Sequence, residues 1–234
     1  MSSLWIGVLW IGIGLALLAV RTPVAVSFGF ISIMGVAHLL DFRAAFGLIS
    51  AIPFDAIGSW ELTAVPMFLL MGYIAVSSGL TSGLFKTMRI FLSRLPGGLA
   101  IASVCACALF SAASGSSVAT SAAMARIAVP EMLRYNYQPS LATGVIAASG
   151  TLGSLIPPSI LMIVYALYAQ ISLGELFLAG VIPGLLTAFM YSAMIVVRVR
   201  RNPALAGSVN ESFSMSEKLE SIKSTWPLPT LIFL

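Results

Sequence analysis

The residues best suited to chemistry in this chain are hydroxyl side chains gathered at 111–124, SAASGSSVATSAAM. This run holds six serines and threonines, one glycine and no charged residue. A second candidate, GTLGSLIPPS at 150–159, adds three hydroxyls, two glycines and two adjacent prolines. Prolines interrupt helices and leave backbone carbonyls without partners. Hydroxyl and carbonyl oxygens are the ligands that hard cations prefer, so both stretches predict cation binding without a fixed negative charge.

The composition places these polar stretches in a membrane protein. The chain has 234 residues, of which 59% are hydrophobic and 9% charged, and its mean hydropathy is +1.03. Soluble domains carry about 25% charged residues. The net charge of +4 includes no basic cluster that would suggest nucleic acid. Cys105 and Cys107 match no common zinc spacing, and we interpret them as small buried hydrophobes.

The elements that would position the hydroxyl runs are predicted to be membrane helices. Residues 1–80 would form scaffold spans with an amphipathic interfacial segment, and residues 81–98 an interfacial basic helix. The first 20 residues lack a basic region before their apolar run, which favours a first span over a cleaved signal peptide. The runs long enough for single spans are 4–20, 23–40, 62–80 and 176–197.

Charge distribution predicts that the first hydroxyl run enters the membrane and returns. The stretch 95–125 carries no charge over 31 residues and is flanked by Arg94 and Arg126. With a re-entrant hairpin, nine basic residues would be cytoplasmic and only Arg43 outside, whereas a single crossing gives six against four. A hairpin over 99–129 therefore fits better, with arms at about 99–113 and 117–129. Its tip would be Ser114, Gly115, Ser116 and Ser117.

The second hydroxyl run predicts a broken helix. Residues 135–174 carry no charge over 40 residues, and an unbroken helix of that length would rise about 60 Å, twice the hydrocarbon thickness. The breakers are Gly150, Gly153, Pro157 and Pro158. Residues 135–197 would thus hold a broken helix and the following span, giving about five spans in all. Two interrupted elements near the midplane are typical of secondary transporters.

The end of the chain changes character. Residues 198–225 are polar and are predicted to form a cytoplasmic loop. The final run at 226–234, WPLPTLIFL, starts another apolar segment that is too short to cross a membrane. We interpret it as the truncated start of a next span.

Four sequence motifs resemble the large membrane (M) subunit of tripartite ATP-independent periplasmic (TRAP) transporters, specifically its N-terminal half. The resemblance implies an all-α polytopic membrane fold that is one half of an inverted-repeat elevator transporter. The motifs are VPMFLLMG at 65–72, FSAASGSSVATSAAM at 110–124, GTLGSLIPPSI at 150–160 and LFLAGVIPGLL at 176–186.

The same resemblance implies a function. The protein would be a multi-pass permease in the bacterial inner membrane that imports organic acids by sodium symport, with sodium as coupling ion and no other cofactor. Its partners would be a small four-helix membrane subunit and a periplasmic substrate-binding protein. Four-carbon dicarboxylates, sialic acids and other organic acids all stay open as substrates. The implied sodium and substrate residues are Ser114, Gly115, Ser116, Ser117, Gly150, Thr151, Gly153 and Pro157.

Other interpretations of these residues stand beside this one. Small and hydroxyl residues also serve as packing surfaces between membrane helices, and Thr151 could cap a broken helix. A serine nucleophile would need a general base, and the lone His38 is predicted at the opposite interface, so we expect no enzyme. A channel-like or structural membrane subunit with a re-entrant loop is the alternative function. Arg126 would anchor the hairpin or pair with a substrate carboxylate.

Overall fold

The computed structural model describes residues 3–207 and 214–226, and every regular element within those ranges is helical. This confirms the predicted all-α class. The chain divides into two compact units, Met1–Ser59 and Trp60–Leu234, which are described separately below.

The first unit is a run of three apolar helices. The middle helix packs against both others. The turn after the first helix is held by Thr22, whose hydroxyl donates to the Leu17 carbonyl at 2.7 Å and lies 2.5 Å from Ser27 Oγ. Large exposed apolar side chains such as Trp5 and Phe28 suit a lipid surrounding. The helices are α1 (Ser3–Ala19), α2 (Val24–Leu39) and α3 (Phe42–Ile57).

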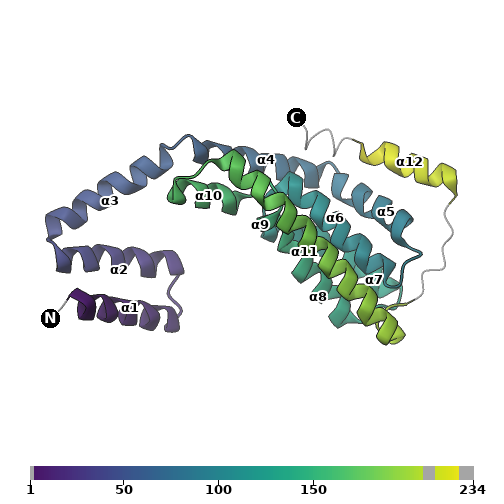
Figure 1. The fold of residues 1–234 in the computed structure, drawn as a ribbon, viewed down its shortest axis with the longest axis horizontal. Coiled ribbons are helices and arrows are strands. Elements are labelled where there is room, and N and C mark those ends of the chain that lie inside the picture. Colours follow the sequence, from purple (N-terminus) through teal and green to yellow (C-terminus); the bar gives the residue numbers. More distant parts are fainter. Residues whose placement is uncertain (1–2, 208–213, 227–234) are drawn as a thin grey trace. The chain divides into compact units, whose positions relative to one another are not determined.

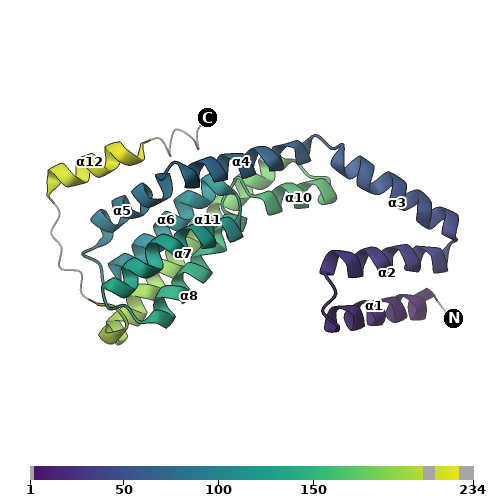
Figure 2. The same ribbon diagram turned by 180° about the vertical axis from the view of Figure 1, so that it is seen from behind.

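The second unit is built around α6, as Figures 1 and 2 show. This helix packs against α4, α5, α7, α8, α9 and α11. Ala100, Ala102 and Ala106 on α6 are fully buried, and such small side chains let neighbouring helices approach closely. The helices of this unit are α4 (Ala64–Ser77), α5 (Leu80–Leu92), α6 (Gly98–Ser114), α7 (Ser117–Arg134), α8 (Pro139–Gly150), α9 (Leu152–Leu155), α10 (Ile160–Ala169), α11 (Leu173–Arg201) and α12 (Met215–Thr225), with 3-10 turns η1 (Glu61–Thr63) and η2 (Pro203–Leu205).

The helix lengths differ from the expected set of about five straight spans. Among the described residues, α11 is the one helix long and apolar enough to cross a membrane, and the number rises to three if each of two bent pairs is one span. These pairs are α4 with α5, bent by 65°, and α8–α9 with α10, bent by 41°. The helices α1, α2 and α6 are apolar but shorter.

The straight span expected over 62–80 is the clearest difference. The helix α4 has 14 residues, which rise only about 21 Å. It stops at Ser78 and Gly79, where Gly79 has a φ of +77° that a side-chain-bearing residue rarely adopts. The basic helix predicted over 81–98 corresponds to α5, which begins after this bend and ends earlier than predicted, at Leu92.

The polar stretch expected as a loop over 198–225 contains helical structure. The helix α11 continues to Arg201. Basic side chains in its last turn interact favourably with the negative end of the helix dipole. The helix α12 begins with a capping box between Ser214 and Glu217. It packs against α5, and the Thr87 hydroxyl donates to the Ser221 carbonyl at 3.1 Å. In the expected next span, 226–234, residues 227–234 lie outside the described residues.

Candidate functional site

The first hydroxyl run forms a tight turn between two helices. The helix α6 ends at Ser114, and the return helix α7 begins at Ser117, close to the predicted arms. Gly115 closes α6 with a φ of +60°, and its N–H donates to the Ser111 carbonyl at 2.9 Å. Ser116 then turns extended and caps α7 by accepting a hydrogen bond from Ala119 N at 3.3 Å. Glycine followed by a serine cap is a sequence that ends one helix and starts another.

The hydroxyls around this turn are largely withdrawn from the surface. Ser114 Oγ lies 2.8 Å from Thr120 Oγ1, and both residues are buried. Ser116 and Ser117 are half-buried. Ser111 is fully buried, and its hydroxyl has no hydrogen-bond partner among the residues that the structure describes. A buried hydroxyl without a partner costs about 1–3 kcal/mol, so an oxygen ligand one turn from the tip is left unsatisfied.

The second hydroxyl run contains the predicted interruption. The helix α9 ends at Leu155 and α10 begins at Ile160, and the backbone is extended at Ile156 and at Ser159 between them. The peptide bond between Pro157 and Pro158 is cis. Buried Ser159 donates its hydroxyl to the Ser154 carbonyl at 3.0 Å, across the break.

The hairpin tip and the break in the helix are in direct backbone contact. Ile160 N donates to the Gly115 carbonyl at 3.0 Å. A Cβ on Gly115 would lie 2.7 Å from the Pro158 carbonyl oxygen, and one on Gly153 would lie 2.7 Å from Ser116 C. Real Cβ atoms do not approach this closely, so both positions must be glycine for the two backbones to meet.

Two of the sequence-predicted residues lie away from this contact. Gly150 packs against Ser121 of α7, whose hydroxyl occupies the place that a Cβ would take. Thr151 is exposed, and its hydroxyl donates to the Ala148 carbonyl at 2.7 Å and lies 3.4 Å from Tyr191 Oη of α11. The structure therefore brings Ser114–Ser117 together with Gly153 and the two prolines, and it places the Thr151 hydroxyl toward α11.

Four helix ends converge where the tip meets the break. The C-terminal ends of α6 and α9 carry partial negative charge, which favours a cation. The N-terminal ends of α7 and α10 carry partial positive charge and N–H groups, which favour an anion. Among the described residues, no three His, Cys, Asp or Glu side chains come together as a metal site would require. The contact can therefore offer neutral oxygens and helix ends.

Three buried hydroxyl residues of this region were not predicted as site residues from the sequence. Ser149 is fully buried on α8, and its hydroxyl donates to the Val145 carbonyl at 2.6 Å and lies 3.2 Å from Cys107 Sγ. It links the broken helix to the first hairpin arm. Ser111 and Thr120 lie within the hydroxyl run itself. Both lie three or four residues from the tip, which is one helical turn. This spacing can be read from the sequence and would have placed their hydroxyls beside the tip.

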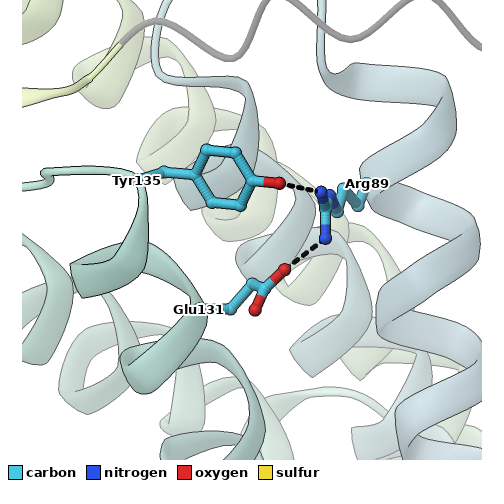
Figure 3. A network of polar contacts seen from close by, with 3 residues as sticks. All are labelled: Arg89, Glu131 and Tyr135. Carbon is cyan, nitrogen blue, oxygen red and sulfur yellow. Dashed lines mark hydrogen bonds and ion pairs between the residues drawn. The ribbon is translucent and has the colours of Figure 1, made fainter.

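An ion pair stabilises the end of the hairpin opposite the tip. Arg89 of α5 forms hydrogen bonds with Glu131 of α7 and with Tyr135 directly after that helix, and its guanidinium carbon lies 4.8 Å from the centre of the Tyr135 ring (Figure 3). The Arg89 and Glu131 side chains are 17% and 22% exposed. We call these three residues the basal cluster. In the sequence, Arg89 is one of the basic residues of the helix predicted over 81–98, and nothing there pairs it with α7.

Tyr137 supports the same end of the hairpin from the turn between α7 and α8. Its phenol oxygen accepts a hydrogen bond from Leu99 N at 3.2 Å, at the start of α6. Burial raises the pKa of the Tyr137 hydroxyl above its ordinary value, although the backbone hydrogen bonds act in the opposite direction. The phenol is therefore neutral at physiological pH and can keep this contact.

These helices, their apolar surfaces and the two interrupted elements define a polytopic membrane protein. A family match extends over residues 11–234 and has the description "Tripartite ATP-independent periplasmic transporter, DctM component". The chain belongs to this family, whose members are transporter permeases and not enzymes.

Curated relatives agree with the family and differ in their named substrates. The chain is 40% identical to the C4-dicarboxylate TRAP transporter large permease protein DctM of Pseudomonas aeruginosa, over 77% of this chain and 42% of the relative. It is 36% identical to the isethionate TRAP transporter permease protein DctMQ of Oleidesulfovibrio alaskensis, over 75% and 27%. It is 35% identical to the ectoine TRAP transporter large permease protein TeaC of Halomonas elongata, over 72% and 39%. The chain thus spans less than half the length of these three relatives.

Proposed function

We propose that this chain is the first half of the large permease subunit of a sodium-coupled transporter in the bacterial inner membrane. It imports an organic acid that a periplasmic binding protein delivers, and a small membrane subunit accompanies it. The observation that carries the proposal is the contact between the hairpin tip and the broken helix, through the Gly115 carbonyl and Ile160 N. A site formed by two interrupted elements is how secondary transporters hold ions and substrates near the membrane midplane.

The oxygen atoms near this contact support sodium as the coupling ion. Sodium is a hard cation without a strong geometric preference, and hydroxyl and carbonyl oxygens suit it. Ser114, Ser116 and Ser117 supply hydroxyls at the tip, and Ser111 adds a buried hydroxyl without a partner among the described residues. The C-terminal ends of α6 and α9 add negative potential. A cation bound here would satisfy the Ser111 hydroxyl, which has no partner among the described residues.

The helix starts near this contact support an organic anion as substrate. The first N–H groups of α7 and α10 lie on either side of the tip, and helix N-termini favour carboxylates. The named substrates of the relatives include C4-dicarboxylate and sialic acid, which are organic acids, and isethionate, which is a sulfonate. Ectoine, a further named substrate, carries a carboxylate and a positive charge. An acidic group is common to all of them, so we infer that the substrate carries one.

Sodium-dependent uptake tests the proposal. The assembled transporter containing this chain would be reconstituted in proteoliposomes with its binding protein, and uptake measured at varied sodium. Ser116→Ala and Ser117→Ala should each raise the sodium concentration that gives half-maximal uptake. The loss of one neutral oxygen ligand corresponds to about 1 kcal/mol, or roughly fivefold in affinity.

Thr143→Val provides the matched control, because Thr143 is exposed on α8 and its hydroxyl donates to the Pro139 carbonyl of the same helix, at 2.9 Å. Membrane insertion should be the same in all three variants. Unchanged sodium affinity in both test variants would remove these residues from the ion site. Uptake that rises linearly with substrate and ignores sodium would favour a channel over a transporter.

A further inference from the structure

A cavity of about 470 Å³ lies on the side of the hairpin that faces α4 and α5. Its walls come from α4, from the turn between α4 and α5 with the start of α5, from the end of α6 and from the return arm α7. Near its inner end Gly72 of α4 lies against the hairpin tip, where an added Cβ would be 3.0 Å from Ser114 Cα. The cavity therefore extends from the tip along the hairpin toward its base.

The polar groups of this cavity gather at the end near the base. Arg126 of α7 lies there, together with Thr81 and Ser82 at the start of α5. Thr81 is 2% exposed, and its hydroxyl has no hydrogen-bond partner within the described part of the chain. Arg126 is exposed and forms no ion pair with any described residue. One cation and one unsatisfied buried hydroxyl thus share one end of the cavity.

The rest of the cavity wall is apolar. Leu69, Tyr73 and Val76 on α4 face Ala119 and Ala122 on α7. Ser114 also reaches the cavity, but its hydroxyl already pairs with Thr120. The helix α7 runs from the tip toward the base, so Ala119 and Ala122 lie nearer the tip and Arg126 lies nearer the base. The cavity wall is therefore apolar toward the tip and basic at its other end. This is the polarity of one leaflet of a bilayer, with its headgroups at the base of the hairpin.

We propose that this cavity binds an anionic phospholipid of the cytoplasmic leaflet. The phosphate pairs with the Arg126 guanidinium and accepts a hydrogen bond from Thr81, while an acyl chain lies along Leu69, Tyr73 and Val76. Basic groups between membrane helices on the cytoplasmic side bind anionic headgroups in this way. The proposal concerns a structural lipid, and the two residues that would hold its headgroup, Arg126 and Thr81, lie outside the proposed sodium and substrate site, although Ser114 borders both.

The lining argues against a soluble organic acid in the same place. Among the described residues that line the cavity, Arg126 is the only cation. A dicarboxylate bound there would leave its second charge without a partner against an apolar wall, which is costly. A lipid has one charged end and an apolar body, so it matches both parts of the cavity.

Lipid retention measured by native mass spectrometry tests this inference. The protein would be purified from membranes, exchanged into detergent with phosphatidylglycerol or phosphatidylcholine, and the bound lipid titrated. We expect phosphatidylglycerol to be retained in preference to phosphatidylcholine. Arg126→Gln should weaken phosphatidylglycerol binding about fivefold, which corresponds to about 1 kcal/mol. Arg134→Gln is the matched control, because Arg134 is an exposed arginine on the same helix that does not line the cavity.

A second variant tests the apolar part of the cavity separately from the headgroup contacts. Ala122→Trp should fill the apolar part of the cavity and displace the lipid while leaving Arg126 in place. Glycerol 3-phosphate, which lacks the acyl chains, should compete only weakly. Equal binding of glycerol 3-phosphate and phosphatidylglycerol would replace the lipid by a soluble phosphate. Equal loss in Arg126→Gln and Arg134→Gln would overturn the site. Size-exclusion chromatography and circular dichroism would establish that each variant is folded.

Discussion

The return arm of the hairpin and the second half of the broken helix begin in different ways, although each follows an interruption. The helix α7 is capped by its own Ser116, whose side chain accepts from Ala119 N. The helix α10 has no such cap, because the Ser159 hydroxyl donates its hydrogen bond to the Ser154 carbonyl. Instead, its first N–H donates to the Gly115 carbonyl of the hairpin. The hairpin turn is therefore closed by local hydrogen bonds, whereas the broken helix depends on the hairpin.

This difference makes the two interruptions one structural unit with an order of dependence. A change that displaces the Gly115 carbonyl should disturb the break, because Ile160 N donates to that carbonyl. A change at the break should leave the tip intact. It also suggests why small residues occur on both sides of the contact. Gly115 and Gly153 have no side chain that would hold the two backbones apart.

The largest expected effect comes from Gly115→Val. A branched side chain at a φ of +60° is strained, and its Cβ would collide with the Pro158 carbonyl oxygen at 2.7 Å. Strain of about 1–2 kcal/mol and overpacking of about 1–3 kcal/mol add to a loss of about 2–5 kcal/mol in the free energy of unfolding. Thermal unfolding in detergent would measure it, and hydrogen exchange should increase at residues 117–120 and at 160–163 alike.

Gly144→Ala serves as the control for this change. Gly144 lies in α8 with nothing within 4 Å of its absent Cβ, so alanine should be neutral or stabilise by up to about 1 kcal/mol. If Gly115→Val left exchange at 160–163 unchanged, the broken helix would not depend on the hairpin tip as we infer.

An intermediate effect is expected at the opposite end of the hairpin, where the basal cluster acts. Arg89→Met leaves the partly buried Glu131 carboxylate without its ion pair. Removing one partner of a fully buried pair costs about 3–5 kcal/mol, and the partial exposure of this pair reduces the expected loss to about 1–3 kcal/mol. Hydrogen exchange should increase in α5 and at residues 128–134, and not at the break.

The double variant Arg89→Met with Glu131→Gln sharpens this test, because it removes both charges and should recover part of the stability. Arg94→Met, at an exposed arginine just after α5, should change the free energy of unfolding by less than about 0.5 kcal/mol. Equal losses in Arg89→Met and Arg94→Met would mean that the basal cluster does not stabilise the hairpin.

Local chemistry explains which parts of this architecture the sequence could predict. The turn at Gly115 and Ser116 has residues that end and cap helices, and Pro157 and Pro158 stop a helix wherever they stand. The capping box at Ser214 and Glu217 was also legible, yet the polar composition of 198–225 led to a predicted loop.

Long-range contacts account for what the sequence could not predict. The hydrogen bond between Ile160 N and the Gly115 carbonyl joins residues that are 45 positions (160 − 115) apart in the sequence. The pairing of Arg89 with Glu131 likewise depends on how α5 packs against α7. The α4–α5 bend had a local signal in Gly79, but the apolar run on either side of it is equally consistent with a straight span.

The smallest expected effect compares the two helix starts directly. Ser116→Ala removes the cap of α7 and should cost about 1 kcal/mol, with faster hydrogen exchange confined to residues 117–120. Ser159→Ala removes the bond to the Ser154 carbonyl, worth about 0.5–1.5 kcal/mol. Here exchange should rise at residues 154–160 while 117–120 stay protected. Both variants are compared in potassium buffer, so that any bound sodium does not contribute. If Ser159→Ala increased exchange at 117–120 as much as at the break, the hairpin would depend on the broken helix in turn, and the one-way order inferred here would be wrong.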